Sequence, residues 1–386
     1  MYKRTLALPP SKSYFLFGPR QIGKSTIVRS LVKPEDMFID LLPQETFLTY
    51  AKNPGRLRGE ILAHLKRHKK FRCVLDEVQK LPSLLDDVHS LIESTPVTFS
   101  LTGSSARKLK RGASNLLAGR AIRYQLFPLT FQELGDDFEL ARALRVGTLP
   151  PVWQKDKDMP AEFLKTYAQT YLREEIQEEG LVRRLGPFSG FLDIAAASDG
   201  EIVNFSNVAR ECHVSVKTVQ QYYQILEDTF LAVKLPAWSR GTREKLVSHP
   251  RYYFFDPGVA NALTHQLAEN LDPVTRGRRF EQFVVNQIRA ALEYHRRDIE
   301  LCFWRTHGGV EVDLVFARGA KIVAAAEIKS SARIAPTHAS GLRAFLDRYP
   351  KTQCFLLFPG EREFLLNPAI SAVPWDQFLK DQLLRL

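Results

Sequence analysis

The sequence predicts an α/β protein that begins with a parallel sheet and ends with a second α/β region. Between Ser13 and Pro128, short apolar runs alternate with amphipathic segments of helical spacing, as in a parallel sheet with crossover helices. The stretch YFLFGPRQIGKSTIV, residues 14–28, passes from an apolar run through a glycine-bracketed loop into helical spacing. Near the C-terminus, a long amphipathic segment precedes three strand-like runs. These three observations support the predicted fold class.

The composition is that of an ordinary globular protein. The 386 residues are enough for two or three domains, and 45% of them are hydrophobic and 25% charged. The formal charge of +11 favours an anionic partner such as DNA, but it also fits a basic surface with no such partner. The four scattered cysteines are expected to be reduced core thiols, and no apolar run suits a signal peptide or a membrane span. We therefore expect a cytoplasmic protein that does not contact a membrane.

Predicted strands and helices alternate along the N-terminal region. After the run YFLF, the segments in chain order are MFIDLL, RLRGEILAHLKRH, FRCVLDEV, LLDDVHSLIE, VTFSLTGS and IRYQLFPLT. In parallel sheets, ligands bind at the carboxyl ends of the strands. The glycine-bracketed loop, the two acids of VLDEV and the threonine of SLTGS all lie at such ends. We therefore expect them to contribute to one site.

The loop that follows the first strand has the pattern G-x-x-x-x-G-K-S, which is typical of a phosphate-binding loop. Gly18 and Gly23 would permit a tight backbone whose N–H groups approach phosphates closely. Lys24 would reach the β- and γ-phosphates of a nucleotide, and Ser25 would hold Mg²⁺. The residues expected to bind the nucleotide are Gly18, Pro19, Arg20, Gln21, Ile22, Gly23, Lys24, Ser25 and Thr26.

Two adjacent acids end the apolar run of FRCVLDEV. Asp76 would hold Mg²⁺ through water, and Glu77 would orient and deprotonate the water that attacks the nucleotide. Such a pair alone is often a solvated strand end, but its place after a phosphate-binding loop favours catalysis. Thr102 would sense the γ-phosphate by a hydrogen bond, although a threonine at a strand end is more often a turn or cap residue.

The motifs GPRQIGKST, VLDEVQ, LTGSSA, LLAGR and FPLTFQEL occur in this order, and together they resemble those of bacterial and archaeal AAA-type ATPases. The subset in question carries a winged helix and a restriction-nuclease-like C-terminal domain, and the resemblance covers nearly the whole chain. It implies a P-loop NTPase sheet with a helical lid, and ATP as the nucleotide. Arg120 of LLAGR matches a basic position that could neutralise transition-state charge, in cis or from a neighbouring subunit. The alternative for Arg120 is a salt bridge with a surface acid.

The expected domains are an ATPase core at residues 1–133, a helical lid or connector at 134–195, a winged helix at 196–260 and a nuclease-like domain at 261–386. In the third domain, a short helix, a turn at residues 213–215 and a longer helix give a helix-turn-helix pattern, with Ser215 as N-cap. FLAVKLPAW and RYYFFD would supply the wing strands. The residues expected on the outer face, whose types contact phosphates and base edges, are Lys217, Gln220, Gln221 and Gln224. A packing module with a merely hydrated polar face is the open alternative.

The C-terminal region places acids on a helix and on two predicted strands. Period-two spacing puts Glu311 and Asp313 on one strand face, and Glu327 and Lys329 on one face of the next strand. Paired strands could therefore bind Mg²⁺ between Asp313 and Glu327, with Lys329 positioning water. Together with Glu281 on the preceding helix, these residues resemble the PD-(D/E)-x-K nuclease motif, although Val312 stands where the motif has proline before the aspartate, a proline that many relatives also lack. Such a fold also serves as a non-catalytic platform, and a strand-end Glu–Lys pair can be a simple surface ion pair.

Three functions fit these patterns. The first is an ATP-driven switch that acts on DNA, and the second is a metal-dependent DNA nuclease gated by ATP. The third is an adaptor that binds a partner protein or a second copy of the chain and hydrolyses almost no ATP. Glu77 argues against the adaptor, because a purely structural nucleotide site needs no general base.

Overall fold

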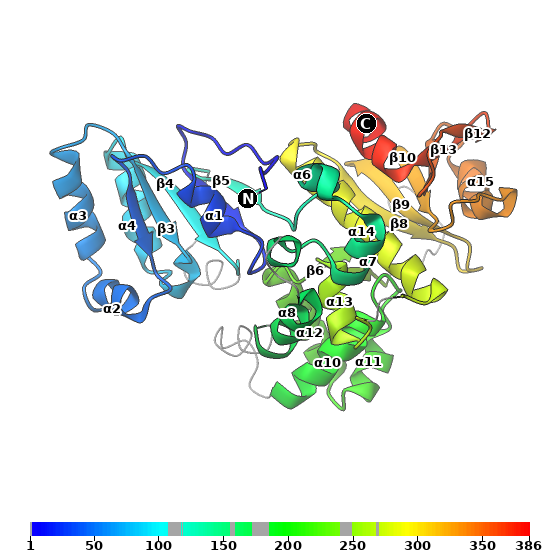
Figure 1. Ribbon diagram of the computed structural model, residues 1–386, viewed down its shortest axis with the longest axis horizontal. Helices are drawn as coiled ribbons and strands as arrows, with labels where there is room; N and C mark the ends of the chain where they lie inside the picture. Colours follow the sequence, from blue (N-terminus) through cyan, green and yellow to red (C-terminus); the bar gives the residue numbers. More distant parts are fainter. Residues whose placement is uncertain are drawn as a thin grey trace. The chain divides into compact units, whose positions relative to one another are not determined.

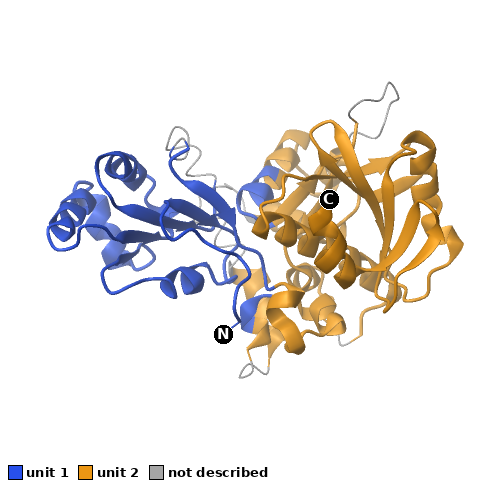
Figure 2. Ribbon diagram, turned by 90° about the horizontal axis from the view of Figure 1, so that it is seen from above, with its two compact units in different colours: residues 1–129, 149–151, 224–231 blue, residues 130–148, 152–223, 232–386 orange. Residues whose placement is uncertain are grey.

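The computed structural model describes residues 2–106, 117, 119–154, 159–171, 185–239, 249–267 and 270–386. They form two compact units, which Figure 2 shows in different colours. Unit 1 comprises Met1–Leu129, Leu149–Pro151 and Gln224–Leu231, and unit 2 comprises Thr130–Thr148, Val152–Tyr223 and Ala232–Leu386.

Unit 1 is built on a five-stranded parallel sheet in the order β2-β3-β4-β1-β5 (Figure 1). Strands β1, β3 and β4 are almost entirely buried, because helices cover both faces of such a sheet and their sequences are accordingly apolar runs. The predicted parallel α/β sheet is therefore confirmed. The strands are β1 (Tyr14–Phe17), β2 (Met37–Asp40), β3 (Arg72–Asp76), β4 (Thr98–Gly103) and β5 (Ile122–Gln125).

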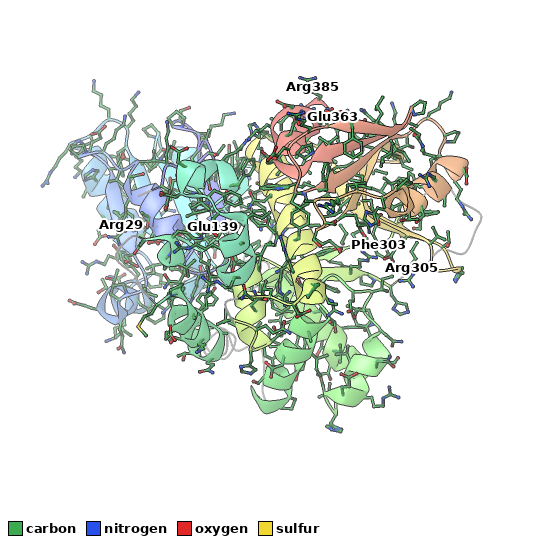
Figure 3. All side chains as sticks on the ribbon, turned by 45° about the vertical axis from the view of Figure 1, so that its right-hand side comes forward. Arg29, Glu139, Phe303, Arg305, Glu363 and Arg385 are labelled. Carbon is green, nitrogen blue, oxygen red and sulfur yellow. The ribbon has the colours of Figure 1, made fainter. Side chains whose placement is uncertain are left out.

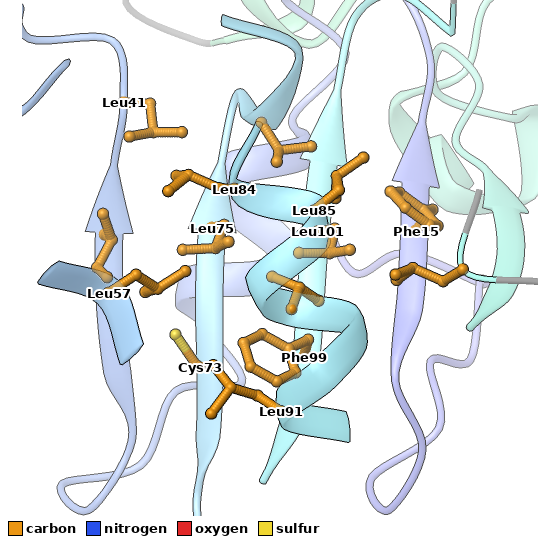
Figure 4. Close-up of a cluster of buried hydrophobic side chains, with 14 of the residues drawn as sticks. Phe15, Leu41, Leu57, Cys73, Leu75, Leu84, Leu85, Leu91, Phe99 and Leu101 are labelled. Carbon is orange, nitrogen blue, oxygen red and sulfur yellow. The ribbon is translucent and has the colours of Figure 1, made fainter. Parts of the chain in front are cut away.

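Helices of unit 1 pack their apolar faces on this sheet. Figure 4 shows Leu84, Leu85 and Leu91 of α4 beside the side chains of β3 and β4, within one buried cluster. This packing holds the carboxyl ends of β3 and β4 side by side, where the predicted acids and threonine lie. The helical elements are α1 (Lys24–Arg29), α2 (Gln44–Lys52), α3 (Arg56–Leu65), η1 (Val78–Lys80) and α4 (Leu84–Ser94).

The segment Gln224–Leu231 belongs to unit 1 although it lies far along the chain. The ring of Phe230 stacks on Phe17 with 5.6 Å between centroids, and the N–H of Ala106 donates to the carbonyl of Asp228 at 3.0 Å. No sequence pattern indicates these contacts, because the segment reads as the end of an amphipathic helix within the predicted domain 196–260.

The middle of the chain is mainly helical and includes a short antiparallel pair of strands, β6 and β7. The N–H of Thr218 donates to the hydroxyl of Ser215 at 3.1 Å, which confirms Ser215 as N-cap of α12. Of the acidic run REEIQEE, all residues lie outside the described ranges. The elements are α6 (Phe131–Leu134), η2 (Gly135–Asp137), α7 (Leu140–Val146), η3 (Pro150–Trp153), α8 (Pro160–Thr166), η4 (Tyr167–Tyr171), α10 (Leu185–Ala197), α11 (Phe205–Glu211), α12 (Val216–Asp228), β6 (Ala232–Leu235), β7 (Arg251–Phe254) and α13 (Pro257–Leu263).

The C-terminal part of unit 2 contains a six-stranded mixed sheet in the order β12-β13-β11-β10-β9-β8 (Figure 1). Its central pairs are β9 with β10, which are antiparallel, and β10 with β11, which are parallel. A second α/β region is thus confirmed. Its elements are α14 (Pro273–Tyr294), β8 (Glu300–Arg305), β9 (Glu311–Arg318), β10 (Lys321–Ile328), η5 (Pro336–Ala339), α15 (Ser340–Arg348), β11 (Gln353–Phe358), β12 (Phe364–Asn367), β13 (Ile370–Pro374), α16 (Trp375–Gln377), η6 (Phe378–Gln382) and η7 (Leu383–Arg385).

Candidate functional site

The loop between β1 and α1 needs glycine at both of its marked positions. Gly18 has φ of 148°, and a Cβ there would overlap the side chain of Ile22 and lie 2.5 Å from the carbonyl oxygen of Leu126. Gly23 has φ of 93°, in the left-handed region that side chains disfavour. The local signature therefore specifies a tight loop, as the sequence predicted.

Lys24 turns back beneath this loop. Its side chain is only 4% exposed, and Nζ donates to the carbonyl oxygens of Gly18 at 2.9 Å and Pro19 at 2.8 Å. The ammonium group is thus held inside the curve of the loop that would receive the phosphates. Buried cations need such acceptors, because an unsolvated charge without partners is costly.

Arg4 also holds the loop, which the sequence did not reveal. Its Nη1 donates to the carbonyl oxygen of Ile22 at 2.7 Å, and its Nη2 donates to that of Phe127 at 2.5 Å. Both acceptors are backbone groups far from Arg4 in sequence. No local pattern marks such a contact, so sequence reasoning could not have found it.

Asp76 lies where β3, β4 and the start of α1 meet. It is 2% exposed, and it accepts hydrogen bonds from the hydroxyls of Thr102 and Ser25. Burial raises the pKa of Asp76 above its ordinary value, and these two hydrogen bonds oppose that rise. The structure therefore brings Ser25 and Asp76 together, and their oxygens are the hard ligands that Mg²⁺ prefers.

Glu77 follows Asp76 in a left-handed conformation, with φ of 59° and ψ of 44°. Its N–H donates to the hydroxyl of Thr102 at 3.0 Å, and its carboxylate accepts from Gln79 Nε2 at 2.5 Å. Ser104 Oγ lies 3.4 Å from the same carboxylate oxygen and accepts from Gln79 Nε2 at 3.0 Å. A non-glycine residue held in this conformation costs roughly 1–3 kcal/mol and is typical of functional sites. Gln79 and Ser104 are additions to the predicted site, and the motifs VLDEVQ and LTGSSA contain them, respectively.

Thr102 and Arg120 have other partners than those expected. The Thr102 hydroxyl is fully buried and is shared between Asp76 and the backbone of Glu77, so it positions the two acids. The Arg120 guanidinium forms an ion pair with Glu93 of α4, which is the predicted alternative of a surface salt bridge. The γ-phosphate sensor and the transition-state role stay predictions.

Three of the four predicted C-terminal residues lie on the elements expected from the sequence, and Lys329 lies one residue beyond its expected strand. Glu281 is on α14, Asp313 on β9, Glu327 on β10, and Lys329 directly follows β10. Asp313 Oδ2 accepts from the N–H of Ile328 at 2.9 Å, and Lys329 Nζ lies 2.5 Å from Glu327 Oε1. The antiparallel pairing of β9 and β10 thus brings the acids of the two strands together.

An arginine that the sequence did not indicate lies among these acids. Arg251 of β7 is 4% exposed, and its Nη1 is 3.4 Å from Glu281 Oε1 and 3.5 Å from Asp313 Oδ1. Its Nη2 is 2.7 Å from Glu311 Oε2. We call Arg251, Glu281, Glu311 and Asp313 the arginine–carboxylate cluster.

Neighbouring side chains complete this cluster. The Tyr253 hydroxyl donates to Glu281 at 2.6 Å, and the Arg251 guanidinium lies over the ring of Phe303 at 4.8 Å. Arg305 Nη1 lies 3.2 Å from Glu311, and Figure 3 labels Phe303 and Arg305, both of which come from β8.

Burial and the neighbouring Asp313 raise the pKa of two carboxyls here. The pKa of Glu281 rises to about 7 and that of Glu327 to about 8, with burial as the larger cause in both. Within the described ranges, no group of at least three His, Cys, Asp or Glu side chains has an arrangement that could hold a metal ion. With a guanidinium between the acids, these residues do not fit Mg²⁺ in the observed arrangement.

Comparison with known families supports the N-terminal prediction. Residues 10–135 match the family model described as an AAA domain, which supports an AAA-type ATPase domain that binds ATP. Residues 137–270 and 276–378 match two models described as domains of unknown function, DUF8612 and DUF4143. The winged helix and the nuclease-like domain therefore stay predictions.

Two relatives that match most of the chain are described as uncharacterized proteins. Uncharacterized protein Rv2008c of Mycobacterium tuberculosis is 27% identical over 392 residues, covering 98% of this chain and 85% of that protein. Uncharacterized protein MJ1544 of Methanocaldococcus jannaschii is 23% identical over 349 residues, covering 82% and 75%. Among solved structures, the Walker-type ATPase paby2304 of Pyrococcus abyssi is 15% identical with a TM-score of 0.44, covering 65% of this chain and 90% of that one. That score is too low to equate the two folds.

Two further expectations concern the whole chain. All four cysteines are buried and form no disulfide in the structure, as expected of core thiols. No helix in the described part of the chain combines the length and the apolar character that a membrane span requires.

The loop geometry predicts that Gly18→Ala weakens nucleotide binding roughly tenfold or more. The new methyl group would overlap Ile22 and the Leu126 carbonyl, so the loop backbone must move. The matched control is Gly59→Ala on α3, where a Cβ meets nothing within 4 Å. Titration with a fluorescent ATP analogue measures both, and equal affinities in the two variants would contradict this account of the loop.

Proposed function

We propose that the chain is an ATP-hydrolysing AAA-type switch that uses nucleotide binding in unit 1 to control an interaction with DNA. One observation carries this proposal: the Asp76 carboxylate accepts hydrogen bonds from the hydroxyls of Ser25 and Thr102, and the Thr102 hydroxyl in turn accepts from the N–H of Glu77. Phosphoryl transfer to water requires a lysine that contacts the phosphates, oxygen ligands for Mg²⁺ and a carboxylate near the attacking water.

Nucleotide binding would exchange hydrogen bonds rather than fill an empty space. Lys24 Nζ now donates to the carbonyls of Gly18 and Pro19, and it would transfer these donations to the β- and γ-phosphates. The N–H groups of the tight loop would bind the same phosphates. Ser25 and Asp76 would hold Mg²⁺, which supplies positive charge against the developing charge of the leaving phosphate.

Hydrolysis would depend on Glu77. Its carboxylate would take a proton from the attacking water, and Gln79 and Ser104 would determine where that carboxylate points. Thr102 would act as a positioning residue, because its hydroxyl joins Asp76 to the Glu77 backbone. Arg120 would contribute in cis or from a second copy of the chain only after leaving Glu93.

The C-terminal cluster favours the switch over the ATP-gated nuclease. A nuclease of this kind needs its acids to hold Mg²⁺, whereas Arg251 lies between Glu281 and Asp313. The adaptor alternative is disfavoured by Glu77, whose strained backbone has no purpose in a site that only binds.

DNA is the proposed partner because of α12. Lys217, Gln220, Gln221 and Gln224 are all exposed on this helix, as expected of a recognition face. The β6–β7 pair follows the helix in the chain, which is the element order of a winged helix. In a switch, ATP and DNA would change each other's affinity by the same factor.

Lys24→Ala should abolish ATP binding at micromolar concentrations. Removing a buried charged partner of the phosphates costs roughly 2–5 kcal/mol. Fluorescent ATP titration measures the effect, and Lys33→Ala, at an exposed position beyond α1, should leave affinity unchanged. Wild-type affinity in Lys24→Ala would remove the proposed nucleotide site.

Glu77→Gln should retain ATP affinity but slow phosphate release by about 10²–10⁴-fold, since the amide cannot accept the proton. Single-turnover phosphate release is the appropriate measurement. Glu45→Gln on the exposed surface of α2 serves as control. If Glu77→Gln hydrolyses ATP at the wild-type rate, another group is the base.

The triple variant Lys217→Ala, Gln220→Ala and Gln221→Ala should weaken duplex DNA binding, while Lys351→Ala, an exposed cation in unit 2, should not. Fluorescence anisotropy at several salt concentrations measures both affinity and its salt dependence. The logarithmic slope should shrink by about 0.9 for each phosphate that the variant no longer neutralises. An unchanged affinity and slope would assign α12 to packing instead of recognition.

A further inference from the structure

We propose that the guanidinium of Arg251 is the resident cation of the C-terminal carboxylate cluster, and that a divalent cation binds there only after Arg251 withdraws. The proposal concerns unit 2 alone and does not depend on the ATPase activity proposed for unit 1. It predicts a latent metal site that the wild-type chain keeps closed.

The charges of the cluster require a cation. Glu281, Glu311 and Asp313 all lie within 3.5 Å of one guanidinium, whose Nη1 and Nη2 contact all three. Carboxylates taken out of water need a compensating charge or a proton, and a planar guanidinium can serve several at once. Arg251 therefore performs the charge compensation that a metal ion would otherwise supply.

A metal ion and Arg251 cannot occupy the cluster together. Mg²⁺ requires oxygen ligands at about 2.0–2.1 Å in a near-octahedral arrangement. The same Glu281 and Asp313 oxygens face Nη1 at 3.4 and 3.5 Å, so the nitrogen takes the space between them. Withdrawal of this one side chain would remove the ion-pair partner that Glu281 and Asp313 share and leave Lys329, which is paired with Glu327, as the neighbouring cation.

One carboxylate oxygen beside the cluster has no hydrogen-bond partner among the described residues. Glu327 is only 6% exposed, and its Oε2 is buried with no donor in the described part of the chain, while Oε1 is paired with Lys329. Glu327 lies on β10 next to Asp313 of β9, because Asp313 accepts from the N–H of the following residue, Ile328. A buried oxygen without a partner is costly, and a divalent cation shared with Asp313 would satisfy it.

The backbone of Arg251 is fixed within a small sheet, while its side chain reaches the cluster. It begins β7, where it pairs with Leu235 of β6, and it also forms a β-bridge with Ile202. Its hold on the cluster comes from side-chain contacts with α14, β8 and β9. The chain that follows β6 is also hydrogen-bonded to β8, since Phe303 N–H donates to the carbonyl of Pro236 at 3.0 Å and Trp238 N–H donates to that of Phe303 at 2.6 Å. Withdrawal of Arg251 would therefore be a movement of its side chain.

The test measures Mn²⁺ binding directly, by electron paramagnetic resonance of free Mn²⁺ and by calorimetry, without any activity assay. All proteins carry Asp76→Asn, so that the nucleotide site does not contribute. The parent should show no Mn²⁺ site that depends on Asp313. Arg251→Met should gain one site that binds Mn²⁺ on the order of tenfold or more tightly than any residual binding to the parent, and adding Asp313→Asn should remove it.

Two further variants keep the test decisive if Arg251→Met fails to fold, since removing one partner from a buried ion pair is strongly destabilising. Glu311→Gln removes the negative charge from the shortest ion pair of Arg251, at a partly exposed position, so it should weaken the hold on the guanidinium and raise Mn²⁺ affinity while leaving Glu281, Asp313 and Glu327 in place. Arg305→Met, which removes a cation that contacts Glu311 from outside, should create no site.

Two results would overturn the proposal. One is an Asp313-dependent Mn²⁺ site in the parent that is as tight as in Arg251→Met. The other is the absence of any gain in affinity in the folded Arg251 or Glu311 variants. In either case Arg251 would be a structural partner of the acids and not a substitute for a metal ion.

Discussion

The burial of Asp76 is the constraint on which the N-terminal site depends. A carboxylate placed at the end of a buried strand needs hydrogen-bond donors, and here they come from Thr102 of β4 and Ser25 of α1. The hydrogen bonds to this one carboxylate therefore join β3, β4 and α1, which are separate in sequence. The same hydroxyl of Thr102 accepts from Glu77, so the position of the candidate base follows from the same requirement.

Much of this region could be predicted because its determinants are local. Parallel strands covered on both faces must be apolar along their whole length, so β3 and β4 are visible as runs that end in polar residues. The loop could be predicted from the sequence for a similar reason, because the backbone at Gly18 and Gly23 requires glycine. Once the strands are parallel, their carboxyl ends must meet, which places Asp76 and Thr102 together.

The contacts that escaped prediction join residues whose proximity no local pattern records. RYYFFD contains the strand β7, as its composition indicates, but nothing in it shows that Arg251 faces Glu281 and Glu311. Period-two spacing put Glu311 and Asp313 on one face of β9, where both contact Arg251, yet it could not say which cation they would share. Likewise, Phe230 stacks on Phe17 because the segment Gln224–Leu231 packs within unit 1, and the residues around Phe230 in the sequence do not indicate this contact.

The left-handed backbone of Glu77 has a consequence for how this protein can evolve. Glycine at that position would adopt the same φ and ψ without steric penalty, so a chain selected only for thermal robustness would drift towards it. Such a substitution would relieve the backbone strain and leave the sheet intact, but it would remove the carboxylate proposed as the general base. Keeping glutamate at this position therefore lowers the stability of the fold in exchange for the carboxylate.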